Sequence, residues 1–216
     1  MSIQHHPGDD LLLAQAAGQL PMGPSLVLAS HVENCARCQA QLRLLEFAGG
    51  ALLEALPEAG LRNDALARTL QCIDASQSVP ITPVQGPPPL PAGTSWPRAL
   101  TGCAIARWRW VAPGIHYSRV QVAQDPDANL FLLRIAAGKY LPQHTHSERE
   151  FTQVLHGSFH DGRAQFSAGD FDATDGRVHH QPVVQAGGEC ICLASVEGRV
   201  LFDGFFARQL GALMGM

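Results

Sequence analysis

Two groups of residues in this sequence have the types and the spacing that bind transition metals. The first is the segment HVENCARC, in which His31, Cys35 and Cys38 are separated by four and then three positions. A structural zinc site needs four thiolate or imidazole ligands in a tetrahedron. If one helix covers this segment, its period of 3.6 residues places the three side chains on one face. The fourth ligand is then expected from His5 or His6.

The same two cysteines also fit a dithiol redox centre, because Cys-X-X-Cys is the spacing of thioredoxin-like sites. Those sites open a helix inside a βαβ unit, and the sequence around HVENCARC predicts no such unit. We therefore favour zinc over a catalytic dithiol. A helical domain of about 75 residues has a marginal core, and a bound zinc ion would stabilise it.

The second group lies in the segment GKYLPQHTHSEREFTQVLHG. His144 and His146 are two positions apart, so on a strand both side chains point to the same face. Glu150 follows closely, and His180 is the expected fourth ligand, with the adjacent His179 as the alternative. Three imidazoles and one carboxylate suit zinc, iron or manganese.

Helices are expected to position the first group. The predicted helical segments are LLLAQAAG, PSLVLASHVENC, CQAQLRLLEFAGGALLEAL and ALARTLQCIDA. Asp9 and Asp10 can cap the first segment, and Gly18 ends it. Pro57 ends the third, because proline cannot continue a helix. Residues 1–78 are therefore predicted to form a small helical domain.

A proline-rich linker and a β-domain are expected to follow. Residues 79–97 contain too many prolines for a packed helix or a central strand. Residues 98–210 contain short apolar segments separated by Gly, Asp and Pro: RWRWV, GIHYSRVQV, NLFLLRIA, FTQVLHGSF, ECICLASV and VLFDGFF. Several short strands at close spacing indicate a sandwich or a barrel, which gives an α+β chain of two domains.

The bulk composition excludes several classes of protein. The 216 residues are 46% hydrophobic and carry a net charge of −4 with no run of Lys or Arg, so direct nucleic-acid binding is not expected. No apolar run approaches the roughly 18–20 residues of a membrane span, and the first residues lack the pattern of a signal peptide. We expect a cytoplasmic protein with no membrane partner, whose six cysteines stay mostly reduced.

Both halves of the second group resemble motifs of the cupin family, whose fold is a β-barrel (double-stranded β-helix). The first motif reads Gly, five residues, His-X-His, three residues, Glu, six residues, Gly, and every position from Gly138 to Gly157 fits it. The second motif fits from Gly169 onward, with Asp175 in place of its Pro and Arg177 in place of its second Gly. The resemblance implies a metal site formed by His144, His146, Glu150 and His180.

The first group is similar to the signature of the zinc-binding anti-sigma domain, which is His, a long gap, then His-X3-Cys-X2-Cys. With the cupin motifs, the whole chain resembles the ChrR-like anti-sigma factors. This resemblance implies zinc held by His6, His31, Cys35 and Cys38. It also implies that the helical domain holds an extracytoplasmic-function (ECF) sigma factor inactive, and that the cupin domain releases it in response to singlet oxygen or organic peroxides.

Other interpretations remain at this point. Cupins with three His and one Glu include dioxygenases, so a metal-dependent cupin enzyme is the main alternative, and a stand-alone metal-dependent transcriptional regulator is a third. Under each interpretation, including the anti-sigma one, the cupin domain is a candidate site for a small-molecule or oxidant ligand. Cys190 and Cys192 alternate along one expected strand and share a face. We hypothesise that they sense oxidants, although small buried strand residues would show the same pattern.

Overall fold

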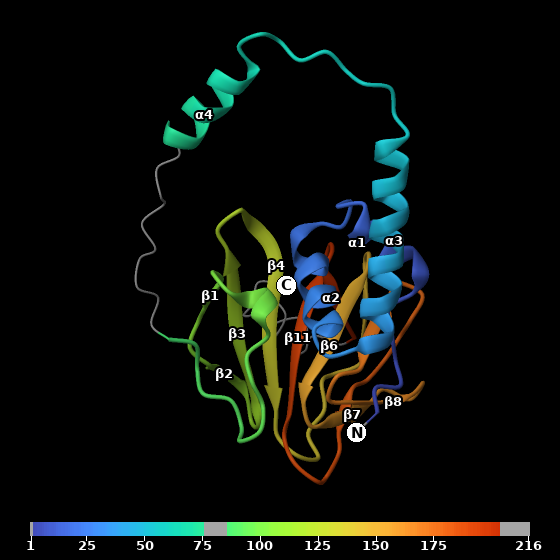
Figure 1. Ribbon diagram of the computed structural model, residues 1–216. Helices are drawn as coiled ribbons and strands as arrows, with labels where there is room; N and C mark the ends of the chain where they lie inside the picture. The colour runs from blue at the N-terminus through green and yellow to red at the C-terminus, as the bar shows by residue number, and fades with distance from the viewer. Residues whose placement is uncertain (1, 76–85, 204–216) are drawn as a thin grey trace.

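The structure, a computed structural model, describes residues 2–75 and 86–203 (Figure 1). Its helices are α1 (Asp9–Ala16), α2 (Met22–Val32), α3 (Ala36–Glu54), α4 (Ala65–Ala75) and a short 3-10 helix, η1 (Arg98–Leu100). The four α-helices lie where the sequence predicts helical segments. Residues 79–85 of the predicted linker and residues 204–210 of the predicted barrel domain lie outside the described residues.

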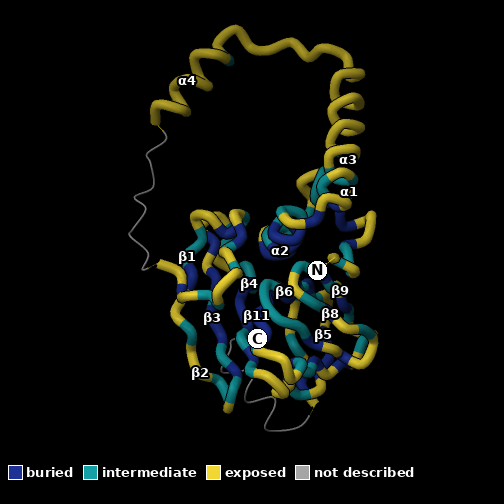
Figure 2. The backbone as a smooth tube through the Cα atoms, turned by 60° about the horizontal axis from the view of Figure 1, so that its bottom comes forward, coloured by how far each residue is buried: buried dark blue, intermediate teal, exposed yellow. Residues whose placement is uncertain are grey.

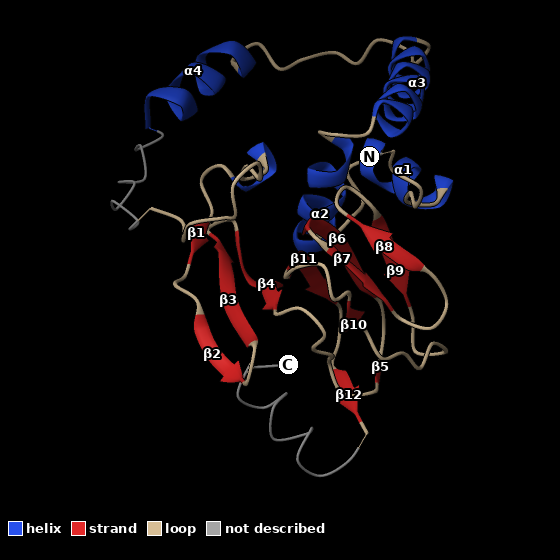
Figure 3. Ribbon diagram, turned by 90° about the horizontal axis from the view of Figure 1, so that it is seen from below, coloured by secondary structure: helices blue, strands red, loops and turns tan. Residues whose placement is uncertain are grey.

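The described residues after η1 form an antiparallel β-domain, as the short apolar segments predict. Its strands are β1 (Ala104–Ile105), β2 (Arg109–Ala112), β3 (Ile115–Val122), β4 (Asp125–Ile135), β5 (His144–His146), β6 (Glu150–His156), β7 (Ser158–His160), β8 (Gln165–Ser167), β9 (Phe171–Thr174), β10 (Val183–Val184), β11 (Cys190–Val196) and β12 (Val200–Phe202). The largest sheet has the order β1-β3-β4-β11-β6-β9, with β2 beside β3 (Figure 3). Two smaller sheets, β10-β7-β8 and β12-β5, complete the domain.

The three sheets enclose one apolar core. Tyr117 on β3, Leu133 on β4, Phe166 on β8 and Phe202 on β12 are all buried in the same cluster. Because the cluster draws on all three sheets, the sheets face one another around it as the walls of a barrel. The predicted α+β class, helices followed by a β-barrel, is confirmed.

The large sheet is buried on both of its faces. Along β4, Leu133 belongs to the core inside the barrel, whereas Leu132 belongs to a second cluster on the outer face. β11 alternates in the same way, with Cys192 inside and Leu193 outside. Successive side chains of a strand point to opposite faces, so burial of every residue of β11 requires a cover on the outside.

The helix α2 provides this cover, and it contacts β4, β6 and β11 (Figure 1). Val27 and Leu28 pack with the outer-face cluster. The Ser30 hydroxyl donates a buried hydrogen bond to the side-chain carbonyl of Gln153 on β6. A Cβ at Gly23 would overlap the Ser195 hydroxyl, so α2 approaches β11 closely here and a larger side chain would displace Ser195 or the helix.

The expectation that one helix covers residues 31–38 is wrong. α2 ends at Val32, and Cys35 is the extended N-cap residue of α3, with φ −111° and ψ 99°. The side-chain amide of Gln39 donates hydrogen bonds to the carbonyls of Val32 and Glu33, which satisfies acceptors that a continuous helix would have used. Helical phasing therefore does not bring the three residues of HVENCARC together.

The second half of α3 and all of α4 after Ala65 are exposed (Figure 2). No residue of α4 is buried, and Cys38 is the one buried residue of α3. The exposed large apolar side chains of this region are Leu44, Phe47, Leu52, Leu53, Leu56, Leu61, Leu66, Leu70 and Ile73. We call these nine residues the α3–α4 apolar surface. None of the described helices is long and apolar enough to cross a membrane.

Candidate functional site

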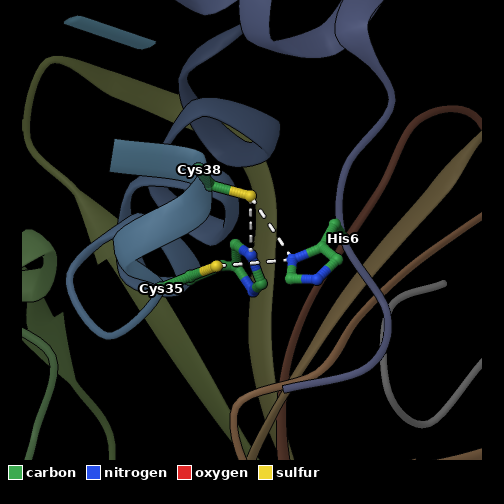
Figure 4. A group of neighbouring side chains, drawn as sticks. His6, Cys35 and Cys38 are labelled. Carbon is green, nitrogen blue, oxygen red and sulfur yellow. Dashed lines mark hydrogen bonds between the residues drawn. The ribbon is translucent and has the colours of Figure 1, made fainter. Parts of the chain in front are cut away.

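The first candidate site lies at the corner between α2 and α3, beneath the extended N-terminal segment. Figure 4 shows the His6 ring facing the sulfur atoms of Cys35 and Cys38. The Nδ1 atom of His6 lies 3.3 Å from Cys35 Sγ and 3.5 Å from Cys38 Sγ. The Nε2 atom of His31 lies 3.3 Å from Cys38 Sγ. Two thiols and two imidazoles thus converge, with every pair of ligand atoms within 4.8 Å.

These distances fit a tetrahedral zinc ion. Zn–S bonds of about 2.3 Å and Zn–N bonds of about 2.0–2.1 Å, at tetrahedral angles, place the ligand atoms about 3.3–3.8 Å apart. The three measured contacts fall in or beside this range. His31, Cys35 and Cys38 are buried and His6 is half-buried, so the donor set is shielded from solvent as in structural sites.

Burial controls the protonation of this cluster in the metal-free protein. It lowers the pKa of His31 to about 4, so the imidazole is neutral at pH 7 and ready to bind a metal. Burial, together with the neighbouring Cys35 thiol, raises the pKa of Cys38 to about 12. A metal that binds Cys38 as a thiolate must therefore displace its proton, and its affinity will increase with pH.

The geometry separates His6 from His5, which the spacing alone left open. The Nε2 atom of His5 lies 3.1 Å from the Gln165 carbonyl oxygen, and its ring contacts Phe166 at 4.6 Å between centroids. His5 thus points to β8, whereas His6 points to the two cysteines.

The second candidate site lies inside the barrel. His144 and His146 are on β5, Glu150 begins β6, and His180 forms an isolated β-bridge with His144. His180 Nε2 lies 3.0 Å from His144 Nε2 and 3.3 Å from His146 Nε2. Glu150 Oε2 lies 3.1 Å from His146 Nε2 and 3.7 Å from His180 Nε2. The four predicted residues therefore converge, and their donors suit a divalent transition metal.

The surroundings orient these side chains toward a common point. His144 Nδ1 lies 2.8 Å from the Pro142 carbonyl oxygen, and donation there leaves Nε2 free to bind a metal. Burial lowers the pKa of His144 to about 4. Burial alone would raise the pKa of Glu150, but the hydrogen bond and charge of His146 outweigh it and hold that pKa at about 2. At pH 7 His144 is therefore a neutral ligand and Glu150 an anionic one.

His179, the alternative to His180, lies outside this cluster. Its side chain is 55% exposed, and its Nδ1 lies 4.0 Å from an Asp203 carboxylate oxygen. His180 is buried, and its Nδ1 faces the Asp161 carboxylate at 3.6 Å.

Sequence reasoning missed a charged network behind His180. Arg163 forms ion pairs with Asp161 and, at 2.7 Å, with Asp172. Although burial opposes it, hydrogen bonds from Ala164 and Arg163 hold the pKa of Asp161 below its usual value. A carboxylate behind the second nitrogen of a metal-binding imidazole orients the ring. The three charged residues are spaced like ordinary surface residues, so the sequence carried no signal for this role.

A small cavity of about 40 Å³ adjoins the second cluster and is lined by His144, Glu150, His180, Cys190 and Cys192. The two cysteine sulfur atoms lie 3.7 Å apart, and both are buried in the barrel core. The prediction that they share a face is confirmed.

An antiparallel barrel with three inward histidines and one glutamate defines a cupin protein, and here a helical segment with a Cys/His cluster precedes it. Residues 97–197 match the family model described as the ChrR cupin-like domain. The chain is 33% identical to the anti-sigma-E factor ChrR of Cereibacter sphaeroides over 210 residues, which cover 96% of each chain. The chain belongs to the ChrR family of anti-sigma factors.

A solved structure supports the same conclusion. The crystal structure of Rhodobacter sphaeroides SigE in complex with the anti-sigma ChrR contains a chain that is 33% identical to this one. The TM-score is 0.71, and the match covers 91% of this chain and 100% of that chain. The similarity therefore includes the helical part as well as the barrel.

Proposed function

We propose that this protein sequesters an ECF sigma factor through its N-terminal helices and thereby prevents that sigma factor from acting in transcription. The observation that supports this most strongly is the match along nearly the full chain to ChrR, which was crystallised with a sigma factor. Because sigma factors act with RNA polymerase, we also infer that the protein works in the cytoplasm.

The α3–α4 apolar surface supports a protein partner at this end of the molecule. Its members are between 51% and 84% exposed, from Leu70 to Leu61. So many large apolar side chains left in water on two successive helices indicate a site of protein association. Among the described residues, nothing covers α4, because none of its residues is buried. We infer that the sigma factor covers it.

We infer further that zinc occupies the N-terminal cluster. His6, His31, Cys35 and Cys38 would hold it, and the ion would have a structural role. It would fix the corner between α2 and α3 and hence the direction of α3.

In the barrel, His144, His146, Glu150 and His180 would hold zinc or another divalent transition metal. We infer that this second ion serves in sensing rather than in catalytic turnover. The adjoining cavity of about 40 Å³ offers room for little more than a few water molecules, which is far below the usual size of a substrate pocket.

We infer that the response to oxidants uses Cys190 and Cys192. Because the cavity beside them is small, an organic hydroperoxide would reach the two thiols during local opening of the barrel; it would oxidise them to one disulfide and would itself be reduced to an alcohol and water. The 3.7 Å between the sulfur atoms makes this reaction sterically accessible. Disulfide formation would shorten that distance to about 2.05 Å and disturb the barrel wall beside the metal cluster.

Co-expression tests this function. The full chain is expressed with each ECF sigma factor encoded in the source genome, and the complex is purified through a tag on the sigma factor. We expect one stable complex that contains zinc, and we expect the double change Cys35→Ser with Cys38→Ser to abolish the complex and to remove the zinc equivalent of the N-terminal cluster. Cys103→Ser, which alters a cysteine outside both clusters, should retain both.

A further inference from the structure

Two members of the N-terminal cluster, His6 and His31, are positioned by the same three residues of the barrel. These are residues 169–171, which end the turn after β8 and begin β9. The barrel contacts His31 directly, and it contacts His6 through the backbone just before it.

The contact to His31 is a hydrogen bond from the ring to the main chain. Its Nδ1 lies 2.8 Å from the Gly169 carbonyl oxygen, so Nδ1 donates and Nε2 is left to face the cysteines. The Phe171 ring packs edge-on against the His31 ring, with 5.7 Å between centroids. Together these two contacts fix both the tautomer and the tilt of the imidazole.

The contact to His6 runs through Asp170, whose side chain is only 2% exposed. One carboxylate oxygen accepts hydrogen bonds from the backbone N–H of Gln4 at 2.7 Å and of His5 at 3.0 Å. The other accepts from Ser167 N–H at 2.8 Å, so the carboxylate itself is held in place. The Phe171 N–H also donates to the His5 carbonyl at 3.1 Å. The backbone leading into His6 is thus bound on both sides.

Close packing leaves little freedom at this junction. Gly169 has a φ of +96°, and a Cβ there would lie 2.8 Å from the Ile3 side chain. A displacement of residues 169–171 would therefore move the N-terminal segment and the His31 ring together.

The same strand also reaches the second metal cluster. Asp172, the next residue, pairs with Arg163, and Arg163 pairs with Asp161. Asp161 faces Nδ1 of the metal-cluster residue His180 at 3.6 Å. One short segment of β9 thus contacts the outer shell of both clusters.

We propose that Asp170 and the Gly169 carbonyl form the outer shell of the N-terminal zinc site, so that the barrel sets the zinc affinity of the sigma-binding helices. Asp170 is a positioning residue in this scheme, because it binds the backbone that carries a ligand and not the metal. The inference rests on the proposed occupation of this cluster by zinc. It means that the barrel binds the zinc site directly through hydrogen bonds, in addition to packing against α2.

Cobalt titration of the full chain tests this proposal. A band from thiolate-to-Co²⁺ charge transfer reports only the N-terminal cluster, because the barrel cluster contains no cysteine. We expect Asp170→Ala to weaken Co²⁺ and Zn²⁺ binding there by about 10–100-fold and to alter the tetrahedral cobalt spectrum. Asp170→Asn keeps one oxygen that can accept from Gln4 and His5, so its metal affinity should lie between that of Asp170→Ala and that of wild type.

A matched control separates this role from general loosening of the helices. Leu100 of η1 is buried in the outer-face cluster against α2, so it also joins the helices to the barrel. Leu100→Ala should lower stability but leave metal affinity and the cobalt spectrum unchanged. Wild-type affinity and spectrum in Asp170→Ala, or in Asp170→Asn if the alanine variant does not fold, would overturn the proposal. A wild-type chain without the thiolate band would overturn the zinc site itself.

Discussion

His31 and Gly169 are 138 positions apart in the sequence, yet the His31 ring bonds the Gly169 carbonyl at 2.8 Å. This contact places a candidate zinc ligand of the helical part against the turn that begins β9 of the barrel. The helices α1 and α2 share a buried apolar cluster with the outer face of the large sheet. A change inside the barrel therefore has a short physical route to the helices that we propose bind the sigma factor.

Charge on the α3–α4 apolar surface should prevent binding of the sigma factor. Leu52 and Leu66 are 73% and 72% exposed, so aspartate at either position costs little in the free protein. In a complex it would bury an unpaired charge. We expect each change to weaken the complex at least about tenfold, which titration calorimetry would measure. Trp110→Asp, at an exposed barrel site, is the matched control and should bind normally.

Loss of the barrel cysteines should block release of the sigma factor by an organic hydroperoxide. We expect the complex with Cys190→Ser and Cys192→Ser to survive tert-butyl hydroperoxide, whereas wild type and Cys103→Ser dissociate. The hydrogen bond between the Cys192 and Cys190 thiols, together with burial, raises the pKa of Cys192, so the reactive thiolate is scarce at pH 7. Release should therefore accelerate between pH 7 and 9. Equal release from the double variant would refute the role of these thiols.

The metal-free protein should lose stability as the pH falls from about 6.5 to about 4. Burial lowers the pKa of both His31 and His144 to about 4, whereas the unfolded chain has ordinary histidines. In that interval the unfolded state binds more protons, so the unfolding free energy decreases by up to about 1.4 kcal/mol per pH unit for each histidine. Urea denaturation of chelator-treated protein would measure this slope.

A histidine variant makes this measurement specific. His144→Gln should reduce the slope, and His179→Gln, which changes an exposed histidine, should not. An identical slope in wild type and His144→Gln would contradict the lowered pKa of His144.

Gly138 and Gly157, the first and last residues of the first cupin motif, should differ in their tolerance of alanine. Both have positive φ, +68° at Gly138 and +72° at Gly157. A Cβ at Gly138 would meet nothing within 4 Å, whereas one at Gly157 would lie 2.1 Å from the Glu189 carbonyl oxygen. We expect Gly138→Ala to cost about 1 kcal/mol and Gly157→Ala about 3 kcal/mol or more, measured by thermal unfolding. Equal costs would show that the backbone beside Gly157 yields easily.

Local spacing predicted the pairs within each cluster, whereas the resemblance supplied the choice of His6 and of His180. His144 and His146 share a face on any strand, and Cys35 and Cys38 lie within one turn of each other. The predicted helical segments left a break between Cys35 and Cys38, whereas the helices break between Val32 and Ala36, because the corner depends on the Gln39 side chain bonding the carbonyls of Val32 and Glu33. His31 does join the cluster, but the argument that placed it on one helix with Cys35 and Cys38 was wrong.

The sequence also contained no indication that the barrel forms hydrogen bonds with the N-terminal cluster and the segment leading to it. Asp170 binds backbone N–H groups about 165 positions away, and any residue type supplies such a group. The choice of His6 over His5 depended on the same contact, because it sets which ring faces the cysteines. The division into residues 1–78, 79–97 and 98–210 remains a prediction.

Competition for the sigma factor tests sequestration most directly. Purified full chain, loaded with zinc, is added to its cognate ECF sigma factor before RNA polymerase core, and run-off transcription from a promoter of that sigma factor is measured. We predict that one equivalent of the chain abolishes the transcript, and that the Cys35→Ser, Cys38→Ser variant leaves it intact. Undiminished transcription with excess wild-type chain, for every ECF sigma factor of the source genome, would contradict the proposed function.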